Sequence, residues 1–146
     1  MRVLVQRSKK SSVRVGNTII GSIDNGLVLL VGFTDGDTIK NIDQLVKKVI
    51  NLRIFDDEDG VMNKSLLDIK GSILSISQFT LYADTRKGNR PSYMNAMAGD
   101  EAVRLYDLFN KKLSEYVHVE TGKFGADMKV NITNDGPVTI LLESRD

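Results

Sequence analysis

Few residues of this chain could take part in catalysis or ligand binding. The first group of them lies at the end of an apolar stretch. The stretch that begins at Ile73 runs into hydrogen-bonding and aromatic residues, namely Ser77, Gln78, Phe79 and Thr80. Binding and catalytic groups are often built where a strand ends, because a rigid scaffold holds the loop there. An ordinary polar strand end with Phe79 in the core would give the same pattern. Residue types alone leave both interpretations open.

A second candidate is the segment Asn134–Thr139, in which an Asx residue is followed by Gly136 and Pro137. These residues are typical of a turn. Glycine also permits a ligand to approach the backbone closely, and proline fixes its own geometry and has no N–H donor. Only about 5–6% of X-Pro bonds in folded proteins are cis, so the sequence by itself does not assign that state to this bond.

A third candidate is the basic loop Thr85–Arg90, whose cations are Arg86, Lys87 and Arg90. A solvated loop explains such a run. A glycine-containing basic loop also suits contact with phosphate groups.

Metal-binding and thiol chemistry have almost no residues to use. The chain has no cysteine, which excludes disulfides, thiolate metal sites and cysteine nucleophiles. His118 is the only histidine and is expected to have a structural or surface role. The acidic run Asp56–Asp59 lacks the ligand spacing of a calcium loop, so an acidic hairpin turn is predicted there. We expect no metal and no cofactor.

Charge and hydropathy restrict the class of protein further. Twenty basic and 19 acidic residues give a net charge of +1, which does not favour a protein that coats nucleic acid through bulk electrostatics. Any role with nucleic acid must be local, and we expect no DNA partner. The longest apolar run, Leu27–Phe33, is far shorter than the roughly 20 residues of a membrane span. The N-terminus lacks the cleavage pattern of a signal peptide, so we expect a cytoplasmic protein with no membrane partner.

Two amphipathic helices are predicted around the candidate sites. Between Asp37 and Asn51, apolar residues recur every three or four positions, with Asp37 or Thr38 as N-cap. A second helix is predicted from about Asp100 to Tyr116. Its apolar stripe consists of Ala102, Leu105, Tyr106, Phe109 and Leu113. Both helices should pack on a sheet.

The remaining periodicity predicts strands. Alternating or apolar segments occur at residues 2–7, 12–20, 27–33, 73–81, 128–133 and 138–143. The segment 27–33 is apolar on both faces and is expected to be central. Asn134–Pro137 is predicted to reverse the chain, so the last two strands should form a hairpin or a sharp corner. With few strand-helix-strand crossovers, we expect a single α+β domain over residues 1–146, with a mostly antiparallel, barrel-like β core and two main helices.

Several segments together resemble the bacterial D-aminoacyl-tRNA deacylases, and the similarity covers essentially the whole chain in order. The segments that carry it are Asn51–Phe55, Met62–Leu66, Ser77–Gly88, Glu120–Met128 and Asn134–Thr139.

The resemblance implies a homodimer that acts on aminoacylated tRNA, with its sites at the subunit interface. Ser77, Gln78, Phe79 and Thr80 would line the catalytic pocket that receives the terminal adenosine. In the family a Gly-Pro dipeptide, here Gly136 and Pro137, is cis and enters the partner's pocket, where it excludes L-amino acids.

The same resemblance assigns supporting roles. Arg7 would hold the dipeptide in place, with Asn134, Val138 and Thr139 as its flanking residues. The polar run Ser8–Lys10 departs from the apolar residue that the family pattern has after Arg7. This departure concerns the packing of that strand end and not the activity.

The proposed reaction agrees with the residue chemistry. Neither motif contains His, Lys or Glu, so a general base would be missing unless the ribose hydroxyl of the RNA takes part. The enzyme would then position an already labile ester and stabilise its oxyanion, with backbone N–H groups near Phe79 and Thr80 as donors. A rigid clash with the dipeptide would reject L-side chains, and glycine would pass because it has no side chain. The alternatives are a non-catalytic dimeric RNA- or ligand-binding module and an esterase with Thr80 as covalent nucleophile.

Overall fold

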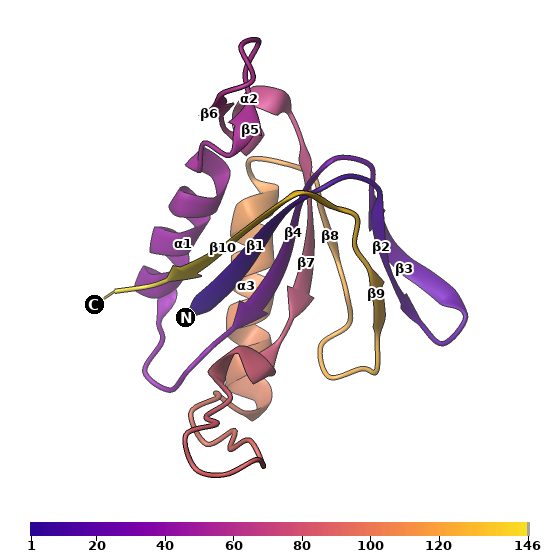
Figure 1. The fold of residues 1–146 in the computed structure, drawn as a ribbon. Helices are drawn as coiled ribbons and strands as arrows, with labels where there is room; N and C mark the ends of the chain where they lie inside the picture. The colour runs from indigo at the N-terminus through magenta and orange to yellow at the C-terminus, as the bar shows by residue number, and fades with distance from the viewer. Residues whose placement is uncertain (146) are drawn as a thin grey trace.

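The computed structural model describes residues 1–145, and a five-stranded sheet forms its centre (Figure 1). Its strands lie in the order β10 (Asn134–Glu143), β1 (Arg2–Ser8), β4 (Gly26–Gly32), β7 (Ser72–Ser77) and β8 (Val119–Thr121). The pairs β10–β1 and β1–β4 are antiparallel, whereas β4–β7 and β7–β8 are parallel. Strand β4 is central, as its two-sided apolar pattern predicts.

Two helices cover one face of this sheet. Helix α1 (Ile39–Asn51) begins after Thr38, whose hydroxyl accepts a hydrogen bond from the Lys40 N–H and so serves as N-cap. Helix α3 (Gly99–Ser114) buries the predicted stripe of Ala102, Leu105, Tyr106, Phe109 and Leu113. Both predicted helices are therefore confirmed. Each completes a crossover between parallel strands, which is why the central sheet is mixed rather than purely antiparallel.

A second sheet packs on part of the opposite face. It consists of β3 (Thr18–Ile23), β2 (Ser11–Val15) and β9 (Lys129–Asn131), in that order. Its residues Val13 and Ile23 are buried in a small apolar cluster with side chains of β4 and β7. The fold is α+β, as expected. Within residues 1–145 the terminal strands β10 and β8 of the main sheet do not pair with each other, so the core is not a closed barrel.

A small projection completes the fold. The strands β5 (Phe55–Asp56) and β6 (Met62–Lys64) form the predicted acidic hairpin, and the short helix α2 (Leu66–Ile69) follows it. Among the described residues, no helix is both long enough and apolar enough to span a bilayer.

Two predicted strands have other boundaries in the structure. The predicted strand 12–20 is a hairpin, because Gly16 has φ +58° and turns the chain between β2 and β3. The predicted strand 73–81 ends at Ser77, and the 3-10 helix η1 (Phe79–Tyr82) follows. Alternating apolar side chains in Phe79–Tyr82 imitate a strand, although Phe79 is 53% exposed.

The segment Asn134–Pro137 does not reverse the chain. It belongs to β10, and the chain passes from one sheet to the other in a corner, since β9 pairs with β2 while β10 pairs with β1. Ser8 lies opposite Asn134 and Gln6 opposite Thr139, so the residues between Asn134 and Thr139 form a bulge beside Arg7. The bulge projects the Gly-Pro dipeptide out of the ladder.

Candidate active site

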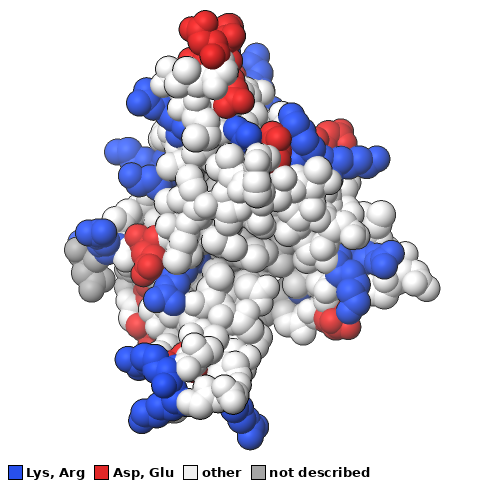
Figure 2. All heavy atoms as spheres, in the orientation of Figure 1, with Lys and Arg blue, Asp and Glu red and all other residues white. Residues whose placement is uncertain are grey.

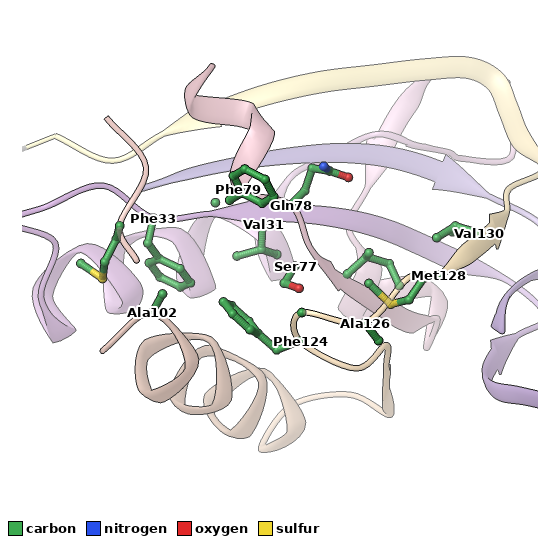
Figure 3. A pocket seen from close by; sticks show the side chains of 14 residues that line it. Val31, Phe33, Ser77, Gln78, Phe79, Ala102, Phe124, Ala126, Met128 and Val130 are labelled. Atoms are coloured by element: carbon green, nitrogen blue, oxygen red, sulfur yellow. The ribbon is translucent and has the colours of Figure 1, made fainter. Parts of the chain in front are cut away.

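A cavity of about 270 Å³ opens where β7 ends (Figure 3). The side chain of Ser77 lies near the middle of this view, with Phe124 below it and Gln78 and Phe79 above it. None of the lining side chains carries a charge. The lining consists of Val31, Gly32, Phe33, Ile76, Ser77, Gln78, Phe79, Met97, Ala102, Phe124, Gly125, Ala126, Met128 and Val130.

The position of Gln78 is set by the end of the neighbouring strand. Its backbone N–H donates to the Val31 carbonyl over 2.7 Å, which is the last link between β7 and β4. A Cβ atom on Gly32 would lie 2.9 Å from the Gln78 carbonyl oxygen. Glycine at position 32 therefore allows the two backbones to approach at the floor of the cavity.

The turn after Gln78 presents two backbone donors. Phe79 and Thr80 are the first residues of η1, and no hydrogen bond within the described residues uses their N–H groups. The Gln78 side-chain amide donates to the Thr80 hydroxyl. Thr80 is exposed and does not line the cavity, so the structure brings Ser77, Gln78 and Phe79 into the pocket and leaves Thr80 at its edge.

The wall formed by the segment after β8 was not assigned a role from the sequence. Phe124 packs against Tyr106 of α3, with ring centroids 5.9 Å apart. The Tyr106 hydroxyl donates to the Ser75 carbonyl over 2.7 Å, and burial raises the pKa of this phenol. A Cβ atom on Gly122 would lie 2.6 Å from the Met128 sulfur. These wall residues could have been predicted from the sequence, because they lie in Glu120–Met128, one of the segments that carry the family resemblance.

The dipeptide segment has its own support. The Gly136–Pro137 peptide bond is cis, and Gly136 has φ +121°. The Arg7 guanidinium donates from Nε to the Asp135 carbonyl at 3.2 Å and from Nη1 to the Ile54 carbonyl at 2.9 Å. Its side chain is 12% exposed and also lies within 3.5 Å of the Asp56 carboxylate. Arg7 thus joins the bulge to the segment that precedes β5.

The flanking residues make a second, smaller network. The Asn134 amide donates to the Arg7 and Val138 carbonyls, each over 3.0 Å, and its oxygen accepts from Gln6 and Thr139. Gly136 and Pro137 themselves are exposed. The polar residues after Arg7 do not disturb this end of β1, since Ser8 is buried and its hydroxyl donates to the Gln6 carbonyl.

Within one chain the two motifs lie at opposite ends of the sheet. Ser77 at the end of β7 pairs with Val31 of β4, and Val31 pairs with Val3 near the start of β1. Asn134 of β10 pairs with Ser8, at the other end of β1. The span from Val3 to Ser8 corresponds to about 17 Å at roughly 3.4 Å per residue. The Gly-Pro dipeptide of a chain therefore does not reach that chain's own cavity.

The basic loop lies near the cavity but outside its lining. Arg86 forms a bidentate pair with Asp84, with 2.7 Å between Nη2 and Oδ2, and this hydrogen-bonded pair holds the pKa of the Asp84 carboxyl at about 2. Lys87 and Arg90 are exposed and form no ion pair with any described residue. Figure 2 shows cationic side chains at the lower end of the molecule, where this loop lies in Figure 1.

His118 is remote from the cavity. Its Nε2 lies 2.9 Å from a Glu120 carboxylate oxygen, and its side chain is 66% exposed. The described residues contain no group of three or more His, Cys, Asp or Glu side chains arranged to hold a metal ion.

Comparison with known proteins assigns the chain to a family. The family model described as D-Tyr-tRNA(Tyr) deacylase matches residues 4–143. Proteins named D-aminoacyl-tRNA deacylase from Bacillus cytotoxicus and Clostridium tetani are 57% and 58% identical over 146 residues, covering 99% of this chain and 100% and 98% of theirs.

Solved structures agree with the fold. A c-Myc DNA unwinding element binding protein has a TM-score of 0.95 and 42% identity, with both chains covered completely. A probable eukaryotic D-amino acid tRNA deacylase, 20% identical, has the same fold, with a TM-score of 0.82 over 97% of each chain. The family match over residues 4–143 and the high identity to relatives of nearly equal length show that this chain belongs to the D-Tyr-tRNA(Tyr) deacylase family.

Proposed function

We propose that the protein hydrolyses the ester bond of D-aminoacyl-tRNA and releases free tRNA and the D-amino acid. The observation that carries the proposal is the uncharged cavity at Ser77–Phe79, because it lies at the segment by which the chain resembles deacylases. Its polar groups are hydrogen-bonding groups rather than acids or bases. Such a cavity is suited to orienting an ester that is already reactive.

In the proposed reaction, water adds to the ester carbonyl carbon while the neighbouring ribose hydroxyl relays the proton. The oxyanion that forms accepts hydrogen bonds from the free N–H groups of Phe79 and Thr80. The bond between the carbonyl carbon and the ribose oxygen then breaks, and that oxygen takes the proton. The products are the amino acid and the ribose hydroxyl of the tRNA.

Selection against L-amino acids is proposed to come from a second copy of the chain. The dipeptide is exposed, is held by Arg7 and lies about 17 Å along β1 from the level of its own cavity, so it is available to another molecule. Backbone atoms in a supported bulge resist displacement better than a side chain does. Glycyl-tRNA is expected to be cleaved as well, because glycine has no side chain to clash.

A partly exposed part of the sheet face supports the dimer. Leu30, Leu4 and Leu141 lie directly opposite one another across β4, β1 and β10, on the face turned away from the helices. Leu141 is 49% exposed, and Figure 2 shows a broad uncharged surface in this region. A second copy placed on this row would bury apolar area on both chains, as two-fold interfaces do.

Neither alternative is favoured by a specific observation. For Thr80 to act as a nucleophile, a base must accept its proton, but the Thr80 hydroxyl instead accepts a hydrogen bond from the Gln78 amide. A non-catalytic binding module would leave the two free N–H donors at the cavity without a role. We further propose that the enzyme works in the cytoplasm, without cofactor or metal.

The deciding experiment compares D- and L-tyrosyl-tRNA of the same sequence. The D-ester should be hydrolysed with turnover, while the L-ester should decay at the rate seen without protein. Binding of both substrates without turnover would support the non-catalytic module. Equal rates on the two esters would contradict the proposed selection.

A further inference from the structure

Outside the cavity, the most unusual surface feature is an exposed aromatic pair at its rim. The rings of Phe79 and Tyr93 meet edge to face, with centroids 5.1 Å apart. Phe79 is 53% exposed and Tyr93 44% exposed, and the adjacent Met94 is 88% exposed. Phe79 also lines the cavity, so Tyr93 extends the cavity wall outward.

Backbone contacts hold Tyr93 at this place independently of its ring. Asp84 and Ser92 form a two-way bridge directly before it, with N···O distances of 2.8 and 2.9 Å. Its own carbonyl accepts from the Ala96 N–H, and the Met97 N–H donates to the Phe33 carbonyl. The backbone around Tyr93 is therefore anchored to the cavity on one side and to the basic loop on the other.

The charges of the loop indicate what the ring would bind. The Asp84–Ser92 bridge closes the loop that carries Lys87 and Arg90, and neither of these exposed cations forms an ion pair with a described residue. Exposed aromatic rings next to free cations form the surface on which single-stranded nucleic acids bind, because bases stack on the rings while phosphates contact the cations. An acidic or purely apolar partner would use only one of these two features.

We propose that Tyr93 stacks on a base of the unpaired nucleotides that precede the terminal adenosine of the tRNA, with Lys87 and Arg90 at the adjacent phosphates. This inference rests on the proposed function, because it takes the cavity to hold the terminal aminoacylated nucleoside. The strand must then leave over the rim, where Tyr93 lies. Tyr93 is a binding residue for the RNA and has no part in the chemical step.

The test compares two substrates that share the reacting ester. D-tyrosyl-tRNA carries the preceding nucleotides and D-tyrosyl-adenosine lacks them. Tyr93→Ala should lower kcat/KM on the tRNA about ten-fold or more, mainly through KM, and change it by less than about two-fold on the adenosine ester. Tyr93→Phe should keep the wild-type values, because it keeps the ring.

Tyr116→Ala is the matched control. Tyr116 is 55% exposed and follows the opposite end of α3, so its loss should affect neither substrate. Equal losses on both substrates in Tyr93→Ala would show that Tyr93 only supports Phe79 and would overturn the proposal. No loss on either substrate would overturn it as well. Unchanged hydrolysis of the adenosine ester also shows that the variant is folded.

A binding measurement separates this inference from the proposed function. Uncharged tRNA with 2-aminopurine in place of the nucleotide before the terminal adenosine should lose fluorescence when it stacks on Tyr93. The quenching should disappear in Tyr93→Ala and persist in Tyr93→Phe and Tyr116→Ala. Quenching that depends on Tyr93, without hydrolysis of either ester, would refute the deacylase proposal alone. Quenching that is equal in all four proteins would refute the stacking.

Discussion

At the scale of single residues, the cavity contains hydrogen-bonding groups where many hydrolases have an acid and a base. The Gln78 amide and Thr80 hydroxyl are bonded to each other, which orients Gln78 but gives Thr80 no group to accept its proton. In the proposed mechanism, proton transfer therefore depends on the substrate. An experiment on this dependence can distinguish an RNA-assisted mechanism from one with a protein nucleophile.

Thr80→Ala is expected to keep measurable turnover, whereas a substrate ending in 2′-deoxyadenosine should react about 10²–10⁴-fold more slowly while still binding. The reason is that, in the proposed mechanism, the ribose hydroxyl and not the Thr80 hydroxyl carries the proton. Single-turnover kinetics on the two substrates measure both effects. A burst of acyl-enzyme in the wild type that Thr80→Ala abolishes would favour the nucleophile instead.

Arg7→Lys is expected to loosen the Gly-Pro dipeptide. Lysine keeps the charge but loses the fork that reaches the Asp135 and Ile54 carbonyls together. The variant should be less stable by about 1–3 kcal/mol and should discriminate less between D- and L-tyrosyl-tRNA. Denaturant unfolding and paired rate measurements check this, with Arg14→Lys at an exposed position of β2 as control. An unchanged ratio of the D- to the L-tyrosyl-tRNA hydrolysis rate would show that Arg7 has no role in selecting the D-amino acid.

At the scale of elements, the site depends on ends and loops of strands rather than on their central parts. Strand β7 ends where the Gln78 N–H meets the Val31 carbonyl, and the bulge in β10 exposes Gly136. The basic loop is closed by its own contacts, among them the pair of Asp84 and Arg86. Arg86 is therefore partly neutralised, and the phosphate-binding role should fall mainly to Lys87 and Arg90.

The pH dependence of that pair follows from the sign of its shift. The hydrogen bonds from Arg86 lower the pKa of Asp84 from 3.8 to about 2. A lowered carboxyl pKa stabilises the folded loop above the unfolded value, and this contribution is lost as the pH falls through about 2. Arg86→Met should return the Asp84 pKa toward 3.8, as followed by an NMR titration of the carboxyl carbon. A carboxyl that titrates at the same pH in both proteins would contradict the pairing.

Salt dependence tests the two free cations. Lys87→Ala and Arg90→Ala should each weaken tRNA binding and lower the slope of log K against log salt by about one unit. Lys111→Ala, in the last turn of α3 and away from the loop, is the control. Slopes equal to that of the wild type would show that the loop is solvated and makes no phosphate contacts.

At the scale of the whole molecule, the cavity and the Gly-Pro dipeptide lie far apart within one chain. The cavity and the dipeptide lie at opposite ends of the same sheet, and the leucine row between them is half-buried at Leu4 and Leu30 and exposed at Leu141. If the sites are shared, a two-fold dimer contains two composite sites, each made from both chains. Only the dimer, and not the single chain, would then be active.

Subunit mixing tests this arrangement. Ala126→Trp should fill the cavity. Gly136→Val should enlarge the dipeptide so that it blocks the partner's cavity, and each homodimer should therefore be inactive. A mixed dimer has one doubly damaged site and one intact site, and should recover about half of the wild-type activity. Confirmed subunit exchange without any recovery would rule out a shared site, because a site within one chain would have no intact copy in the mixture.

The sequence by itself determined the family, the two helices, the central strand and the acidic hairpin. The reason is that periodicity and capping are local properties, visible in stripes such as Ala102–Leu113 and in the N-cap Thr38. Local signals also misled, since Phe79–Tyr82 alternates like a strand and Asn134–Pro137 has the composition of a turn. In both cases contacts with other segments decided the conformation, through the Val31 carbonyl and through β1.

Only the tertiary structure decided how far apart the motifs lie and what completes the pocket. Strand pairing sets the level of Ser77 and of Gly136 on the sheet, and pairing between distant segments cannot be derived from residue types. Phe124 and Met128 became lining residues because the segment after β8 folds back over β7, and Tyr93 became part of the rim because its loop closes beside Phe79. These contacts join residues far apart in the chain, so their geometry exists only once the sheet has formed.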